Sequence, residues 1–432
     1  MPMEQLLHYV WKHKLFATAP LKTTEGVDVE VIDVGLHNDN AGADFFNAKV
    51  KLGDTLWVGN VEIHDMASQW FEHGHHNDPR YNNVVLHVVG KADMECLTQD
   101  GKQLPQMELA VPSGLAAHYG ELLAADKFPP CHHIIPQLQR LTLHSWLAAL
   151  QTERLESKTE AVVRRVERAN GSWEDAFFIT LARNFGFGVN GDAFERWAAN
   201  IPLRCVDHHR DNAFQIEALF MGQAGLLNDV AIPARHRDAA TAESYFELLK
   251  KEYAYLAHKF NLQPLDPSLW LFLRLRPQNF PHIRLSQLAV LHHSRRASLA
   301  NIVACENLAQ LRKALATQVS GYWQTHYVFG GESKASDKAL STASRDVLIL
   351  NTVVPVLFAY GRHRHNDALC DRAYQLLDEL KAEDNHIVRM WKACGLEVNN
   401  AGDTQALIQL KNEYCDRKNC LRCRIGYEYL RR

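Results

Sequence analysis

The side chains best suited to chemistry lie in residues 44–64, whose pattern is typical of a β-hairpin. Glu62 and His64 are two residues apart, so on a strand they project from the same face. A turn at residues 53–54 brings Asp44, at the start of the first strand, beside them. We predict Asp44, Glu62 and His64 as catalytic residues, with Asp44 and Glu62 binding Mg²⁺ or Mn²⁺. The alternative is that they are polar positions of a half-exposed hairpin.

A cluster of histidines follows the hairpin. His73, His75 and His76 are predicted metal ligands, because neutral imidazoles together with a nearby carboxylate bind Zn²⁺ and other transition metals. Asp78 could supply that carboxylate, while His87 within an apolar strand is more typical of a hydrogen-bonded core residue. The alternative for the cluster is a polar loop after a helix, where histidines cap the last carbonyls.

Three cysteines close to the C-terminus form a second candidate metal site. Cys415, Cys420 and Cys423 have the spacing of the first three cysteines of plant-type [2Fe–2S] ferredoxins, and they also fit a zinc site. The fourth ligand must come from upstream, Cys394 being the nearest cysteine in sequence. We therefore predict these three cysteines as ligands of Zn²⁺ or of an iron–sulfur cluster. Ordinary reduced thiols are the alternative.

The same tail is locally basic. Residues 411–432 contain seven Lys or Arg and three Asp or Glu, with Tyr414, Tyr427 and Tyr429 among them. Basic groups interleaved with aromatic rings suit a nucleic-acid backbone and its bases, so nucleic acid is a candidate partner. A solvated helix face explains the same residues equally well.

The elements that position these residues can be read from hydrophobic periodicity. An amphipathic helix is predicted at residues 3–16, and a short helix is predicted at 65–73. Strands are predicted at 27–36, within the hairpin, at 84–89 and at 106–111. The resulting order is α-β-β-β-α-β, and the sheet is expected to be mixed.

From about residue 137 the pattern becomes helical, which predicts an α+β protein with three parts: an α/β domain at 1–130, a helical domain at 137–400 and a basic Cys-containing tail at 401–432. The linker at 128–133 marks the first boundary. The helices expected in the second part are 141–169, 173–184, 214–226, 241–260, 285–292, 306–316, 343–360, 366–381 and 384–394.

Composition limits the class of protein. The 432 residues carry a net charge of −3, with 47% hydrophobic and 22% charged residues, as in a folded globular chain. No apolar run of about 18 residues and no signal peptide is evident, so we expect no membrane partner. The cysteines number nine, an odd count, and six of them are scattered singly. This does not resemble a disulfide framework and favours reduced thiols and a cytoplasmic location.

The hairpin resembles the core of the PD-(D/E)xK nuclease superfamily. There, an Asp and a Glu from adjacent strands hold Mg²⁺ and a Lys two residues after the Glu assists the attacking water. In this chain Ala43 replaces the Pro and His64 replaces the Lys. The resemblance covers about the first 110 residues and implies a nuclease-like fold and phosphodiester hydrolysis. Some members also tie their domain together with an iron–sulfur cluster, in a layout similar to this tail.

The whole chain also resembles an uncharacterised bacterial family, a domain of unknown function. The residues that carry this resemblance are Gly-Asn-Val-Glu-Ile-His at 59–64, His-Gly-His-His-Asn-Asp-Pro at 73–79 and Val-Val-Leu-His-Val-Val at 84–89. The family supplies no activity. Two functions are therefore expected: a metal-dependent phosphodiester hydrolase or an inactive relative of one, or else a non-catalytic scaffold or nucleic-acid-binding module with a structural metal in its tail.

Overall fold

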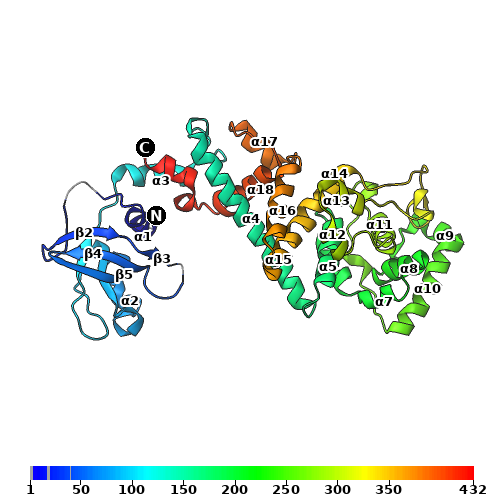
Figure 1. The fold of residues 1–432 in the computed structure, drawn as a ribbon, viewed down its shortest axis with the longest axis horizontal. Helices are drawn as coiled ribbons and strands as arrows, with labels where there is room; N and C mark the ends of the chain where they lie inside the picture. Colours follow the sequence, from blue (N-terminus) through cyan, green and yellow to red (C-terminus); the bar gives the residue numbers. More distant parts are fainter. Residues whose placement is uncertain (1–2, 17–19, 39) are drawn as a thin grey trace. The chain divides into compact units, whose positions relative to one another are not determined.

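The computed structural model describes residues 3–16, 20–38 and 40–432, which form two compact units (Figure 1). The first unit comprises Met1–Trp146, Cys394–Leu396 and Leu410–Arg432, and the second comprises Leu147–Ala393 and Glu397–Gln409. The linker predicted at 128–133 lies within the first unit. The tail from residue 410 onward packs with the first unit, whereas residues 401–409 belong to the second.

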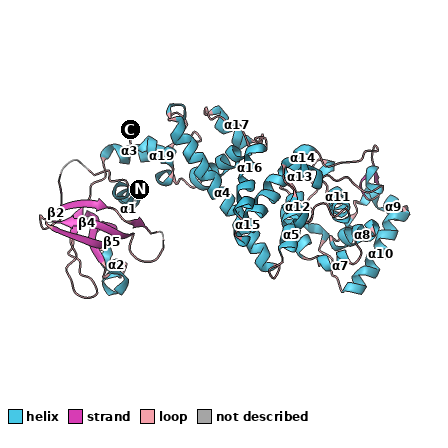
Figure 2. Cartoon of the chain, viewed as in Figure 1, coloured by secondary structure: helices cyan, strands magenta, loops and turns pink. Residues whose placement is uncertain are grey.

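The first unit contains all strands of the large sheet (Figure 2). Its elements are α1 (Met3–Lys12), β1 (Leu21–Lys22), β2 (Asp28–Asp33), β3 (Leu36–His37), β4 (Phe45–Leu52), β5 (Thr55–Met66), α2 (Gln69–Glu72), η1 (His75–Asn77), η2 (Pro79–Tyr81), β6 (Val84–Lys91), β7 (Gln106–Glu108), α3 (Ser113–Ala124), η3 (Ile135–Gln137), η9 (Leu410–Cys415), η10 (Cys420–Arg422) and α19 (Arg424–Leu430).

The sheet is mixed, as predicted. Its strand order is β1-β2-β4-β5-β6-β7, with β3 paired to β4. Pairings from β1 to β5 are antiparallel, whereas β5–β6 and β6–β7 are parallel. A parallel step needs a crossover, which is provided by the segment containing α2. Helix α1 contacts β5 and β6 and buries Leu6, Leu7, Val10 and Trp11. The predicted order α-β-β-β-α-β is thereby confirmed for the longer elements.

A β-bulge in β4 sets the register of the hairpin. Ala48 pairs with Gly59, but Phe45 pairs with Val61, so β4 contains one extra residue between the two pairs. Asn47 adopts a left-handed conformation with φ of 55°, which Asn tolerates better than most residues. The bulge shifts the strand by one position, and Asp44 therefore lies level with Glu62 instead of Ile63.

Two predicted elements are shorter than expected for local reasons. The helix predicted to end at residue 16 ends at Lys12, because Lys14 is left-handed with φ of 49° and the Leu15 N–H returns to the Val10 carbonyl. The strand predicted at 27–36 is interrupted after Asp33. Gly35 there has φ of 86°, and a Cβ atom would lie 2.5 Å from the Phe46 carbonyl oxygen.

The second unit is almost entirely helical. It contains most of α4 (Arg140–Arg168), then α5 (Trp173–Phe185), α6 (Gly191–Ala199), α7 (Leu203–Asp207), α8 (Ala213–Gln223), η4 (Asp229–Ala231), α9 (Ala234–Ala242), α10 (Ser244–Phe260), η5 (Pro267–Leu269), η6 (Pro277–Asn279), α11 (Pro281–His293), α12 (Leu299–Ala304), α13 (Leu308–Ala314), η7 (Tyr322–Gln324), β8 (His326–Val328), β9 (Gly331–Glu332), α14 (Thr342–Leu348), the π-helical η8 (Ile349–Val353), α15 (Val354–Arg364), α16 (Asp367–Glu379), α17 (His386–Ala393) and α18 (Ala401–Gln409).

The predicted long helix at 141–169 is confirmed as α4, and the predicted helix at 241–260 is divided at Glu243 into α9 and α10. The segment Thr342–Arg364 is long and apolar enough to cross a membrane by length and composition alone. However, 61% of its most apolar window is buried inside the protein, as in a core helix of a soluble protein. A soluble protein fits this finding, and the cytoplasmic location stays a prediction.

Candidate metal centre

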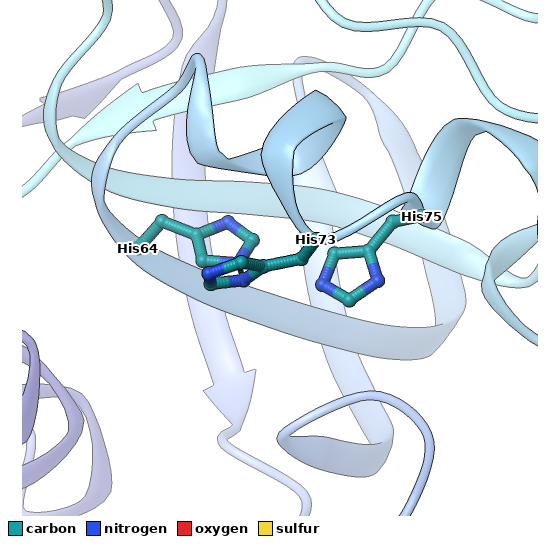
Figure 3. Close-up of side chains that lie close together, drawn as sticks. All are labelled: His64, His73 and His75. Atoms are coloured by element: carbon teal, nitrogen blue, oxygen red, sulfur yellow. Dashed lines mark hydrogen bonds between the residues drawn. The ribbon is translucent and has the colours of Figure 1, made fainter.

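Three imidazoles meet beside the central strands of the sheet. Figure 3 shows His64 on β5, His73 just after α2 and His75 on η1, with their rings directed toward one another. One ring nitrogen from each lies within 4.8 Å of the others, and within the described residues this is the one such group of three His, Cys, Asp or Glu side chains. The fold therefore brings together three potential metal ligands from separate elements.

Glu62 adds an oxygen to the three nitrogens. Its Oε1 atom is 3.1 Å from His75 Nε2 and 3.6 Å from His64 Nε2. The His64 Nε2 atom is in turn 3.2 Å from His73 Nδ1. A tetrahedral metal with bonds of about 2.05 Å places neighbouring donors about 3.3 Å apart. These three separations are close to that value. The three histidines are therefore spaced to share one transition-metal ion, with Glu62 Oε1 beside two of them.

Asp44 lies at the edge of this group. Its backbone N–H donates to Glu62 Oε2 over 3.1 Å, and its Oδ2 accepts from the Ile63 N–H over 2.8 Å. The same Oδ2 atom is 3.4 Å from His8 Nε2 on α1. The structure thus places Asp44 beside Glu62 and His64, as the hairpin pattern indicates, and adds His8 to the group.

The electrostatics of the centre favour either a protonated Glu62 or a bound cation. Burial and the neighbouring Asp44 charge raise the pKa of Glu62 to about 9. Burial also lowers the pKa of His8, but Asp44, Glu4 and Glu62 outweigh it, and the net pKa of His8 is raised. Two carboxylates close together in a low-dielectric site favour protonation unless a cation neutralises them.

Burial holds His64, His75 and His87 in the neutral form by lowering their pKa values, and neutral imidazole is the form that binds metal. Burial, followed by the nearby His87 and His75, lowers the pKa of His64 to about 2. Burial likewise lowers the pKa of His87 to about 3. His87 Nε2 lies 2.8 Å from His64 Nδ1, so it orients the His64 ring while leaving His64 Nε2 facing His73 and Glu62. His87 therefore supports the centre from behind, a role typical of groups around metal ligands.

Two residues of the predicted histidine cluster lie elsewhere. His76 Nε2 is 2.8 Å from the Asn77 amide, and its ring packs against Phe71, so it is not part of the group of three. Asp78 forms a paired interaction with Arg80 and caps η2. Its carboxylate is thus committed to the local turn.

Cys415, Cys420 and Cys423 also come together, with Cys131 as a fourth cysteine on the same cavity. Sequence reasoning treated Cys131 as isolated, because its neighbours in space are far away along the chain. Of the tyrosines in the tail, Tyr429 donates its hydroxyl to Glu121 and Tyr427 packs against His13, so both are used in packing.

A basic cavity of about 310 Å³ lies next to the metal centre in the same unit. Lys12, Lys418 and Arg422 line it, and within the described residues no acidic side chain does. His8 lines the cavity as well and links it to Asp44. The buried Tyr9 hydroxyl, also on its wall, has no hydrogen-bond partner in the described part of the chain. His8 and Lys12 were not predicted, because their positions on α1 acquire meaning only once α1 is packed on the sheet.

Comparison with known proteins gives a family but no activity. No curated protein and no solved structure gave a significant match to the chain. A family model described as "Protein of unknown function (DUF2851)" matches residues 4–386, which is most of the sequence. The match includes the metal centre and ends before the cysteines of the tail. The chain therefore belongs to the DUF2851 family.

Proposed function

We propose that this protein is a metal-dependent phosphodiester hydrolase that uses a transition metal. The observation that carries the proposal is the convergence of His64, His73 and His75, with Glu62 Oε1 beside two of them and Asp44 alongside Glu62. A nitrogen-rich donor set favours Zn²⁺ over the Mg²⁺ that an all-oxygen set would select, while Mn²⁺ accepts both kinds of donor with lower affinity. His64 is then a ligand and not a substitute for the lysine of the nuclease motif.

The basic cavity supports an anionic substrate. Lys12, Lys418 and Arg422 present three positive charges beside His8, and their field attracts a phosphodiester backbone. His8 lies between the cavity and Asp44, so a phosphate bound in the cavity would be close to the metal centre. The sheet order α-β-β-β-α-β, with Asp44 before β4 and Glu62 within β5, further supports the resemblance to the PD-(D/E)xK nucleases.

The chemistry divides between the ion and the side chains. A bound transition metal supplies Lewis-acid stabilisation of the phosphate charge and an activated water. His8, whose pKa is raised, can hold a proton at Nε2 and donate it toward the leaving oxygen, while Asp44 orients the His8 ring. Lys12 and Arg422 position the backbone of the substrate.

A structural metal site is the second candidate. Four protein donors make a closed site, whereas catalytic zinc usually keeps one position open. His73 is the exposed member of the set, so replacing it separates the two functions. In a catalytic site the His73→Ala variant keeps much of its activity or changes its metal preference. If the site is structural, the parent protein has no hydrolytic activity, and the His73→Ala variant only lowers the unfolding temperature.

The test is hydrolysis of bis(p-nitrophenyl) phosphate and of single- and double-stranded oligonucleotides by protein made without a histidine tag, with Mn²⁺, Zn²⁺ or Mg²⁺ added. We expect activity with Mn²⁺ or Zn²⁺ that falls by about 100-fold in Glu62→Gln. Glu30→Gln is the matched control, because Glu30 is an exposed carboxylate on β2 of the same sheet. Absence of hydrolysis with every metal, from protein shown to bind the metal, would contradict the proposal.

A further inference from the structure

Four cysteines of the first unit surround one small cavity of about 20 Å³. They are Cys131, Cys415, Cys420 and Cys423. Cys131 lies in the turn Pro129–Ile134, and the other three come from the segment between η9 and α19. All nine cysteines of the chain, each within the described residues, are free thiols. Four unoxidised sulfurs on one cavity wall form a complete set of ligands for a metal centre.

The backbone of the tail is built around this cavity. Cys415 ends the π-helical segment η9, a form of helix common at functional sites. Lys418 then adopts a left-handed conformation with φ of 54°, and the Asn419 N–H donates to the Tyr414 carbonyl. Gly426 leaves room for the turn, because a Cβ atom there would lie 2.1 Å from the Cys420 carbonyl oxygen. These contacts define the conformation of the loop that carries the cysteines.

The thiols are removed from water together. Burial is the main cause that raises the pKa of Cys131 to about 12 and of Cys423 to about 11, although the Gly426 and Ile425 N–H groups act on Cys423 in the opposite direction. Burial also raises the pKa of Cys420, and this outweighs the opposite effect of the Lys418 charge. Metal binding at these cysteines therefore requires the loss of their thiol protons.

A buried donor points at the same sulfurs. The Trp146 indole N–H is buried and has no hydrogen-bond partner within the described part of the chain. It lies close enough to Cys423 to lower that pKa slightly. A donor of this kind is satisfied when the thiol becomes a metal-bound thiolate, since thiolate sulfur is a better acceptor than a thiol.

The spacing of the sulfurs decides between the candidate metals. A zinc ion bound at 2.3 Å holds its sulfurs about 3.8 Å apart. Among the described residues, no three of these sulfurs lie within 4.8 Å of one another. An iron–sulfur cluster spreads its thiolates over more than one iron atom and therefore accommodates a wider set.

We propose that Cys131, Cys415, Cys420 and Cys423 bind an iron–sulfur cluster. The proposal goes beyond phosphodiester hydrolysis and does not depend on it. The cluster fixes the segment from residue 410 to the C-terminus onto the turn at Cys131, and Cys131 replaces Cys394 as the fourth ligand. Cys394 does not line the cavity.

The test is anaerobic purification of the full chain without a histidine tag, followed by assays of iron and acid-labile sulfide and by electron paramagnetic resonance after reduction. We expect iron and sulfide in equal amounts, about two or four of each per chain, and a brown protein. Cys131→Ser and Cys420→Ser should each lose most of the iron and sulfide. Cys394→Ser and Cys205→Ser are matched controls outside the cavity, and both should retain them.

Three results would overturn the proposal. The first is stoichiometric zinc without sulfide. The second is protein without iron even after incubation with Fe²⁺ and sulfide under anaerobic conditions. The third is full retention of the cluster in Cys131→Ser. Because a ligand variant can fail to fold, circular dichroism is recorded for each variant, and the iron and sulfide content of the unaltered chain decides independently of any variant.

Discussion

Two buried carboxylates of this protein differ in how they are satisfied. Glu217, in the second unit, accepts hydrogen bonds from the Tyr245 hydroxyl and the Trp323 indole N–H. Glu62 accepts from one backbone N–H, that of Asp44, and otherwise faces histidine nitrogens. A buried, ionised carboxylate without enough hydrogen-bond donors destabilises the folded state unless it is protonated or binds a cation. At the scale of the residue, this difference separates a structural glutamate from the glutamate that we propose as a metal ligand.

Burial of a single histidine predicts a pH dependence of stability in the second unit. His282 is 2% exposed among Phe272, Trp323 and Phe329, and burial lowers its pKa from 6.5 to about 3. The unfolded chain therefore binds one more proton than the folded chain between these values. As the pH falls from 6.5 toward 3, the free energy of unfolding should decrease by about 1.4 kcal/mol per pH unit from this residue.

The measurement is urea unfolding at a series of pH values for the parent, His282→Gln and His258→Gln. His258 is exposed on α10 and serves as the matched control. The slope of stability against pH should be smaller in His282→Gln than in the other two proteins. Equal slopes in all three would show that His282 is accessible to protons in the folded state.

At the scale of the element, the bulge at Asn47 controls the metal centre. A regular β4 would place Asp44 level with Ile63 and turn its carboxylate to the other face of the sheet. Asn47→Val disfavours the left-handed conformation by about 1–2 kcal/mol, so we expect metal affinity to fall by about tenfold. Asn47→Gly permits that conformation and should retain the affinity. Isothermal titration with Mn²⁺ and Zn²⁺ measures both, and equal affinities would show that the bulge does not position Asp44.

The sequence predicts the helices and strands better than it predicts which side chains from different elements come together. The turn at residues 53–54 brings Asp44 to the end of the hairpin that carries Glu62 and His64, because turn position is a local property. A regular hairpin would nevertheless place Asp44 level with Ile63, on the face opposite to Glu62 and His64. The bulge at Asn47 has no signal beyond one residue that tolerates positive φ. Cys131 could not be assigned to the other cysteines, since only the tertiary fold brings the turn at Pro129–Ile134 to the tail.

Helices show the same limit. The long periodic pattern of α4 is recognisable, whereas α3 was missed although its buried Leu115, Tyr119 and Leu122 follow helical spacing. The short helices α6 and α12 were missed too, because few turns give little periodicity. Local patterns report what a segment can form, and packing decides which side chains share a site.

At the scale of the molecule, the two compact units predict a localised response to metal. Hydrogen exchange of the full chain should slow on addition of Mn²⁺ or Zn²⁺ within residues 20–38, 40–91 and 106–108. Residues 147–393 should be unchanged and serve as the internal reference. At a metal concentration 100 times the dissociation constant, the expected stabilisation is about 2.7 kcal/mol. Asp44→Ala and Glu62→Gln should reduce it. Uniform protection of both units would indicate unspecific binding.

The loop from Cys415 to Cys423 belongs to two cavities at once. Its cysteines face the small apolar cavity, while Lys418 and Arg422 line the basic cavity beside the metal centre. If both proposals hold, oxygen destroys the cluster during purification and the loop loses its support. Lys418 and Arg422 then leave their positions in the basic cavity, where they attract the substrate. An enzyme prepared in air would then show little activity although its hydrolytic centre is intact. In the cell, its rate of hydrolysis would fall as the oxygen supply rises.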